Sequence, residues 1–98
     1  MKFGFVLPCR SWAPIDVGSV GRTAQLAEEL GFDDLWVTEN TLDDSFSFEA
    51  MAVLSYAAAR TTRIGLGVSV VVLPLHHPVH VAHQVATLDY LSGGRALL

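Results

Sequence analysis

Residues 64–91 read IGLGVSVVVLPLHHPVHVAHQVATLDYL, and this stretch decides the fold. It opens with a run of small and β-branched apolar residues, 67–73, in which apolar and polar positions do not alternate. Such a run predicts a strand buried on both faces, as in a parallel sheet covered by helices. Pro74 ends the strand, and Pro78 opens a helix, because proline in the first helical turn loses no hydrogen bond. The apolar residues of that helix recur at helical spacing: Val81, Ala82, Val85, Ala86 and Leu88.

The rest of the chain repeats this strand–loop–helix unit. The other predicted elements are strands at 2–7, 35–38 and 95–98, and helices at 17–30 and 48–60. Asp16 is expected to cap the first helix, and Gly31 is expected to end it in the left-handed conformation. The apolar stripe of the first helix is predicted to be Val17, Val20, Ala24, Ala27 and Leu30.

The spacing of these units is the strongest structural signal in the sequence. The residues predicted to lie in mid-strand are 30, 31 and 30 positions apart: Phe5, Leu35, Leu66 and Ala96. A strand, a helix and two loops take about 30 residues in a βαβ unit, and such repetition indicates parallel strands. A closed (β/α)8 barrel and an open doubly wound sheet are both compatible with this spacing.

The absence of a phosphate fingerprint favours the barrel. A dinucleotide-binding sheet normally carries G-x-G-x-x-G after its first strand. Residues 8–12, PCRSW, contain no glycine, and residues 65–67, GLG, lie inside a strand without the third glycine. We therefore predict an α/β chain of the (β/α)8 TIM-barrel type, with three β/α units and the start of the fourth strand. Because a barrel typically takes about 250 residues, we expect the first part of a larger protein or a truncated remnant.

Composition narrows the class of protein and partner. The 98 residues fit one domain, and 51% of them are hydrophobic, which is ample for a core. The formal net charge of −4 argues against nucleic acid and anionic membranes as partners. Cys9 is the only cysteine, so no internal disulfide is expected, and no membrane span or signal peptide is recognisable. These features predict a cytoplasmic protein.

Four motifs resemble those of the bacterial luciferase-like monooxygenase family, and within it the branch that uses the deazaflavin coenzyme F420. They follow one another in the family's order and span nearly the whole chain: KFGFVLP at 2–8, LAEELGFDDLWVTEN at 26–40, LGVSVVVLPLHHP at 66–78 and QVATLDYLSGGR at 84–95. The resemblance implies that residues 1–98 are the N-terminal part of a TIM-barrel domain. Members of the family that depend on FMN share most of these motifs.

The resemblance also implies a cofactor across the carboxyl-terminal mouth of the barrel, on the loops that follow the strands. After the second strand the family commonly has a Ser or Thr, an acidic residue that touches the cofactor, and a histidine that transfers protons in some members. Thr38 and Glu39 match the first two positions. Asn40 replaces the histidine, and an amide cannot act as a general acid or base, so no catalytic residue is assigned. On the residues alone, this segment is more typical of a helix cap or a solvated turn.

After the third strand, family members carry a non-proline cis peptide that backs the central ring of the cofactor. The matching bond joins Ser69 to Val70, and the resemblance therefore places Ser69, Val70 and Val72 at the cofactor. The residues alone favour an ordinary buried strand whose serine bonds to the backbone.

The loop after the first strand leaves two alternatives open. Cys9, beside Arg10, could be a nucleophile with a lowered pKa, but nothing in the family requires one, and a small buried thiol is the simpler interpretation. Trp12 could cover a substrate pocket or pack on the rim of the barrel.

Four histidines raise the question of a metal site: His76, His77, His80 and His83. Metal sites usually add a Cys, Asp or Glu ligand, and none lies close by in sequence, so no metal is predicted. The resemblance suggests another role, because family members often carry basic residues here that meet an anionic cofactor tail or a subunit partner. Residues 93–95, GGR, indicate a helix end rather than a phosphate loop.

The sequence thus predicts an oxidoreductase, or the N-terminal fragment of one, that transfers hydride between F420 and a small organic substrate. The phosphate-binding residues and most of the substrate pocket would then lie beyond Leu98. The alternative within the family is a monooxygenase that uses reduced FMN and oxygen. A third hypothesis is a non-catalytic half-barrel that only binds cofactor or self-associates, because a partial barrel exposes a sheet edge. A homodimer is the expected assembly.

Overall fold

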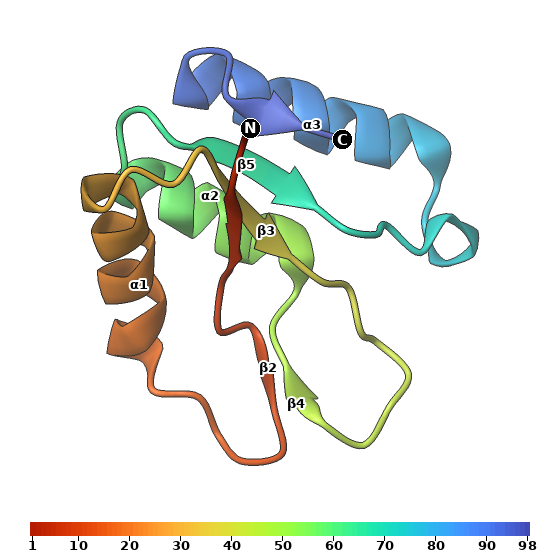
Figure 1. Cartoon of the computed structure of the whole chain (residues 1–98). Helices are drawn as coiled ribbons and strands as arrows, with labels where there is room; N and C mark the ends of the chain where they lie inside the picture. Colours follow the sequence, from red (N-terminus) through yellow and green to blue (C-terminus); the bar gives the residue numbers. More distant parts are fainter.

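A four-stranded parallel sheet forms the centre of the structure, a computed structural model that describes all residues from Met1 to Leu98. The strands lie in the order β1 (Gly4–Val6), β3 (Asp34–Val37), β5 (Gly65–Val68) and β6 (Ala96–Leu97). They are connected in turn by helices α1 (Val17–Glu29), α2 (Ala50–Arg60) and α3 (Pro78–Ser92), with a 3-10 turn at Leu73–Leu75 before α3 (Figure 1). Each parallel strand is therefore reached from the previous one through a helix.

The strand register confirms the spacing found in the sequence. Phe5 pairs with Leu35, Leu35 with Leu66, and Leu66 with Ala96. The repeat of 30 or 31 residues thus brings one residue of each strand into a single row across the sheet. The strand order runs in sequence without a reversal, as in a barrel, whereas a doubly wound sheet reverses at a switch point.

One face of the sheet is covered by the helices, and the core lies between these two layers. Helix α2 lies between α1 and α3 and contacts both. The strands contribute Leu35, Val37, Leu66 and Val68 to the core, and the helices contribute Val20, Ala24, Ala27, Val53, Leu54, Ala57 and Leu88. The small residues of α1 and α2 let the helices approach the sheet closely. This one-sided core fixes which side chains of each strand point away from the helices.

Trp36 lies on the opposite face of the sheet, where two glycines make room for its ring. A Cβ placed on Gly67 would lie 2.4 Å from the indole, and one placed on Gly4 would lie 2.5 Å from the indole nitrogen. The indole therefore extends across β1 and β5, the two strands that flank its own. In a closed barrel this face is the interior.

Strand β5 is shorter than the predicted strand at 67–73. It ends at Val68, which pairs with Val37, the last residue of β3. The amide of Ser69 still donates to the Val37 carbonyl at 2.8 Å, but beyond it no neighbouring strand continues the ladder. Val70 is 68% exposed, so the prediction of a strand buried on both faces is wrong for this part.

The predicted ends of α1 are confirmed, whereas its predicted apolar stripe is only partly buried. Asp16 caps α1 by accepting from the Gly18 amide, and Gly31 is left-handed, with a φ of 88°. Val17 and Leu30, however, are exposed, because α1 packs through a narrower stripe of small residues that includes Gly21. The predicted helix at 48–60 begins at Ala50, where Glu49 caps it.

The chain has one sheet that the sequence did not predict. Strands β2 (Arg10–Ser11) and β4 (Phe46–Ser47) pair in antiparallel fashion and join the loops that follow β1 and β3. Arg10 strengthens the ribbon, because its guanidinium donates to the Ser45 hydroxyl at 2.9 Å and pairs with Asp43. The loops at this edge of the parallel sheet are therefore tied together.

None of the three helices combines the length and the apolar character that crossing a lipid bilayer requires; the longest of them, α3, has 15 residues.

Candidate functional site

The carboxyl ends of β1, β3 and β5 meet at one edge of the sheet, as parallel pairing requires. The Leu7 amide donates to the Trp36 carbonyl at 2.9 Å, and the Ser69 amide donates to the Val37 carbonyl at 2.8 Å. These bonds hold the first residues of the three loops beside one another. This edge is where barrel enzymes place their chemistry.

Glu39 links the loop after β3 to the loop after β5. One carboxylate oxygen accepts from the Val72 amide at 2.5 Å, and the other is paired with Nε2 of His76. The side chains of Glu39 and His76 are only 10% and 27% exposed. Both oxygens are therefore engaged within the protein, at a largely buried position.

Asn40 belongs to a second polar group at the same edge. Its side-chain amide donates to the Thr38 hydroxyl at 3.0 Å, and its backbone carbonyl accepts from the Ser47 hydroxyl. The Thr38 hydroxyl also lies 3.7 Å from Sγ of Cys9. The loops after β1 and β3 and strand β4 are thus connected through Thr38 and Asn40.

Cys9 is 3% exposed, and its thiol contacts only the Thr38 hydroxyl by hydrogen bonding. This burial confirms the interpretation of a packed thiol and argues against a nucleophile presented to a substrate. Trp12 is 81% exposed, so it does not pack on the core of this chain.

The peptide bond between Ser69 and Val70 is cis, as the resemblance implied. Both side chains are exposed at the strand edge. Val72, two residues further, places its amide on Glu39. The structure thus brings Glu39 and Val72 into contact, with Ser69, Val70 and Asn40 at the same edge, while contact of these residues with a cofactor stays a prediction.

The four histidines do not form one cluster with shared contacts. His76 pairs with Glu39, whereas Nδ1 of His77 accepts from the Val79 amide and caps α3. The rings of His77 and His80 meet edge to face, with centroids 5.6 Å apart. No group of three or more His, Cys, Asp or Glu side chains is placed to hold a metal ion.

The pairing of His76 with Glu39 was missed by the sequence analysis. The two residues are 37 positions apart, and no sequence motif contains both of them. The strand prediction could nonetheless have suggested the pair. Glu39 and His76 follow β3 and β5, which are neighbouring parallel strands, and polar residues that follow such strands lie at the same edge of the sheet.

One further ionised group borders this edge. Asp43 accepts hydrogen bonds from the hydroxyl and amide of Ser45 and pairs with Arg10, and these contacts hold the pKa of its carboxyl below the usual range. The loop beside the site therefore keeps a negative charge that Arg10 balances.

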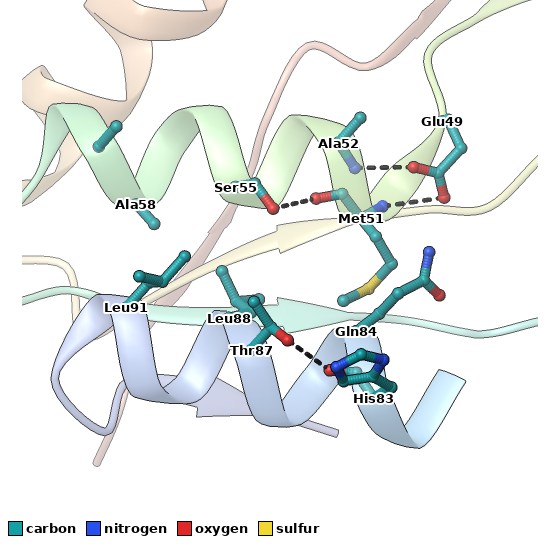
Figure 2. Close-up of a pocket in the computed structure, with 11 residues that line it drawn as sticks. Glu49, Met51, Ala52, Ser55, Ala58, His83, Gln84, Thr87, Leu88 and Leu91 are labelled. Atoms are coloured by element: carbon teal, nitrogen blue, oxygen red, sulfur yellow. Dashed lines mark hydrogen bonds between the residues drawn. The ribbon is translucent and has the colours of Figure 1, made fainter. Parts of the chain in front are cut away.

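A large hollow of the structure lies away from the strand ends. It is an open groove of about 670 Å³ between α2 and α3, on the outer surface of the helices (Figure 2). The Ser55 and Thr87 hydroxyls on its walls each donate to a carbonyl of their own helix, at 2.8 Å. The remaining lining is mostly apolar, with Ala52, Ala58, Ala59, Leu88 and Leu91 among the lining residues. The groove thus has a mixed lining, in which Glu49, His83 and Gln84 add polar groups at one end to the apolar residues.

Comparison with known proteins connects this geometry to a family. The model for the family described as luciferase-like monooxygenase matches residues 1–98. A 4-hydroxyprotoasukamycin monooxygenase from Streptomyces nodosus subsp. asukaensis is 40% identical over 84 residues, which are 82% of this chain and 23% of the relative. An F420-dependent glucose-6-phosphate dehydrogenase from Kineococcus radiotolerans is 33% identical over 103 residues, which cover 100% of this chain and 30% of the relative.

The solved structures agree with the fold. The coenzyme F420 dependent tetrahydromethanopterin reductase from Methanopyrus kandleri superposes with a TM-score of 0.82 at 31% identity, covering 98% of this chain and 25% of that one. The chain thus spans less than a third of the length of each of these three proteins. The likeness confirms the predicted barrel-type fold, of which three β/α units and the start of the fourth strand are present.

Proposed function

The chain belongs to the luciferase-like monooxygenase family, and from this premise we propose that it is the N-terminal part of a barrel oxidoreductase that transfers hydride between coenzyme F420 and a small organic substrate. Two of its relatives, at 33% and 31% identity, carry F420 in their names. The observation that carries the proposal is the meeting of the loops after β3 and β5 at one edge, where Glu39 bonds to Val72. The domain would comprise residues 1–98 and the rest of the barrel.

The residues proposed to form the cofactor site, by contacting the cofactor or by holding the segment that contacts it, are Glu39, Asn40, Ser69, Val70 and Val72. The site offers a planar ring an exposed strand edge, because Ser69 and Val70 are both exposed, Val70 by 68%, whereas the space beside Gly67 is taken by the Trp36 indole. F420, when bound, supplies the two-electron hydride chemistry. The chain's own share would be to hold the ring against the strand edge and to exclude water from one of its faces.

A second candidate is a monooxygenase that uses reduced FMN and oxygen. It is favoured by the relative at 40% identity, which is named as a monooxygenase. The third candidate is a non-catalytic half-barrel that binds cofactor or self-associates. Under all three proposals we place the protein in the cytoplasm, where a free, buried thiol such as that of Cys9 stays reduced.

Cofactor titration tests the proposed site. We expect F420 to bind the purified protein, and Val70→Asp to weaken binding at least about tenfold, because a charge at an exposed apolar contact must be desolvated by the ring. Leu42→Asp is the control, because Leu42 is 83% exposed in the loop between β3 and β4. Fluorescence of the bound cofactor measures affinity, and thermal unfolding checks that both variants fold.

The outcomes of the titration distinguish the three proposals. Binding of FMN but not F420, with oxygen consumed in the presence of reduced FMN, would favour the monooxygenase. Equal affinities of the Val70 and Leu42 variants would remove Val70 from the site. Absence of binding of either cofactor would leave the non-catalytic proposal.

We also propose that the chain forms homodimers through the groove between α2 and α3. The groove has an apolar part whose hydroxyls are already bonded to their own helices and a polar part that contains Glu49, His83 and Gln84. This combination suits a partner surface with the same mixture, and a second copy offers it in an isologous contact. Leu91 on its rim is 77% exposed.

Leu91→Lys is therefore expected to shift the protein from dimer to monomer at micromolar concentration, measured by sedimentation. Lysine is tolerated in the last turn of a helix, so folding should persist. The matched control is Leu26→Lys on α1, where Leu26 is 54% exposed away from the groove. A wild-type protein that sediments as a monomer, or two variants that behave alike, would contradict this use of the groove.

A further inference from the structure

Glu39 lies on the helix side of the strand end. Leu35 and Val37 of β3 are fully buried toward the helices, and Glu39 continues their alternation, while Trp36 lies on the opposite face. Glu39 and His76 border the same small hollow, which Val68, Val71, Val81 and residues of α2 also line. The carboxylate is thus underneath the loop after β5 and does not face the open side of the sheet.

The carboxylate holds this loop at two points. One oxygen accepts from the Val72 amide at 2.5 Å, and the other binds Nε2 of His76, so that the 3-10 turn at Leu73–Leu75 lies between the two contacts. The His76 amide closes the turn by donating to the Leu73 carbonyl at 3.0 Å. We refer to Glu39, Val72 and His76 together as the Glu39 clamp.

The clamp engages both oxygens of the Glu39 carboxylate inside the protein, away from the exposed strand edge. Both Glu39 oxygens have a partner, and 10% of the side chain is exposed. In contrast, Ser69 and Val70, which precede the clamped turn, are exposed at the strand edge. A ring bound at this edge would therefore meet the Ser69–Val70 backbone before it could meet the carboxylate.

We infer that Glu39 is a positioning residue, which acts with His76 by fixing the segment 69–76 against which the cofactor binds. The inference refines the proposed function and rests on it only for the cofactor; the fixing of the segment is a property of the protein alone. A carboxylate suits this task, because hydrogen bonds to an ionised acceptor are about twice as strong as neutral ones. Its bonds to one amide and one imidazole also fix both ends of a short turn.

Four variants separate positioning from direct contact. Glu39→Ala removes both hydrogen bonds of the clamp. His76→Phe removes only the bond between the carboxylate and the imidazole and keeps a ring in the hollow. Glu39→Gln keeps an oxygen for the Val72 amide and an NH₂ group for the His76 ring. Asp44→Ala is the control, because Asp44 is exposed in the loop after β3 and forms no side-chain hydrogen bond.

Two measurements are made on each variant. Amide hydrogen exchange of segment 69–76 is followed without cofactor, and F420 and FMN are then titrated. We expect Glu39→Ala to speed exchange of this segment about tenfold, since the partly buried Val72 amide loses a charged acceptor. Cofactor binding should weaken by a similar factor. His76→Phe keeps the bond to the Val72 amide, and Glu39→Gln keeps both bonds in a weaker neutral form, so each should produce a smaller change in both quantities, whereas Asp44→Ala should stay within about threefold of wild type.

Unchanged exchange of 69–76 in Glu39→Ala would overturn the inference, whatever the binding data show. Equal losses of cofactor affinity in Glu39→Ala and Glu39→Gln, with normal exchange in both, would assign Glu39 to direct contact instead. If the wild-type protein binds neither F420 nor FMN, the proposed function fails, and the exchange measurement still decides whether the Glu39 clamp fixes the segment.

Discussion

Replacing Arg95 by methionine is expected to lower the free energy of unfolding by about 3 kcal/mol, because several carbonyls lose a charged donor at once. The Arg95 guanidinium donates to the carbonyls of Ala58, Thr61, Ile64 and Ser92 and to the Thr61 hydroxyl, at distances from 2.7 to 3.2 Å. Methionine keeps an unbranched apolar stem and none of the donors.

The position explains why an arginine is needed there. Ala58 and Thr61 lie at the end of α2 and Ser92 lies at the end of α3, so the guanidinium supplies donors to the carbonyls that both helix ends leave free. Arg95 has no carboxylate partner, and its charge is instead placed at the negative ends of two helix dipoles. Arg95→Lys should recover less than half of the loss, because an ammonium cannot reach five acceptors in a plane.

Urea unfolding of the variants measures these changes. Arg22→Met is the matched control, because Arg22 is also paired, with Asp16 at 2.6 Å, but its side chain is 68% exposed. A surface pair of this kind contributes about 0–1 kcal/mol. Equal losses for Arg95→Met and Arg22→Met would show that the partly buried network of Arg95 adds nothing beyond a surface charge.

The fold was predictable from the sequence because its strongest signal is local and repeated. Each β/α unit takes the same length of chain, so the predicted mid-strand residues Phe5, Leu35 and Leu66 fall in one row of the sheet. Helix ends were also predictable, since Asp16 and Gly31 act on neighbouring backbone groups.

The candidate site was predictable only in part. The sequence located the end of the strand before Glu39, whereas only the family resemblance assigned Val72 to the same site. It could not show that Glu39 turns toward His76, or that Arg10 pairs with Asp43, since these contacts join residues 37 and 33 positions apart. The early end of β5 was missed for a similar reason: an apolar run shows where a strand can extend, whereas the length of the neighbouring strand decides where it stops.

A second large effect is expected at Glu28, whose carboxylate holds the turn between α2 and β5. Its oxygens accept from the amides of Thr62, Arg63 and Ile64, with closest distances of 3.0, 2.7 and 2.8 Å. Glu28 lies at the end of α1, so these bonds join the first helix to the entry of the central strand. Glu28→Gln should lower the free energy of unfolding by about 2 kcal/mol at pH 7, because a neutral amide offers one weaker acceptor to three amides.

The effect should depend on pH in a direction that the hydrogen bonds determine. Partial burial raises the pKa of Glu28, but the amides of Ile64, Arg63 and Thr62 and the Thr62 hydroxyl lower it more, so the folded-state pKa is below that of the unfolded chain. The unfolded state then binds more protons in this range, and the stabilisation is complete above the unfolded pKa and is lost as pH falls through the folded pKa. Asp16 and Asp43 also have lowered pKa values, so the wild-type slope alone does not isolate Glu28.

The difference between wild type and Glu28→Gln does isolate it, because the two aspartates are common to both proteins. Unfolding free energies measured by urea titration from pH 7 down to about pH 3 should differ most at neutral pH and converge on acidification, since a protonated Glu28 resembles glutamine. Glu29→Gln is the matched control, one residue further along α1 and exposed, and it should follow wild type throughout. A constant offset between wild type and Glu28→Gln across this range would mean that the stabilisation by Glu28 does not depend on the charge of its carboxylate.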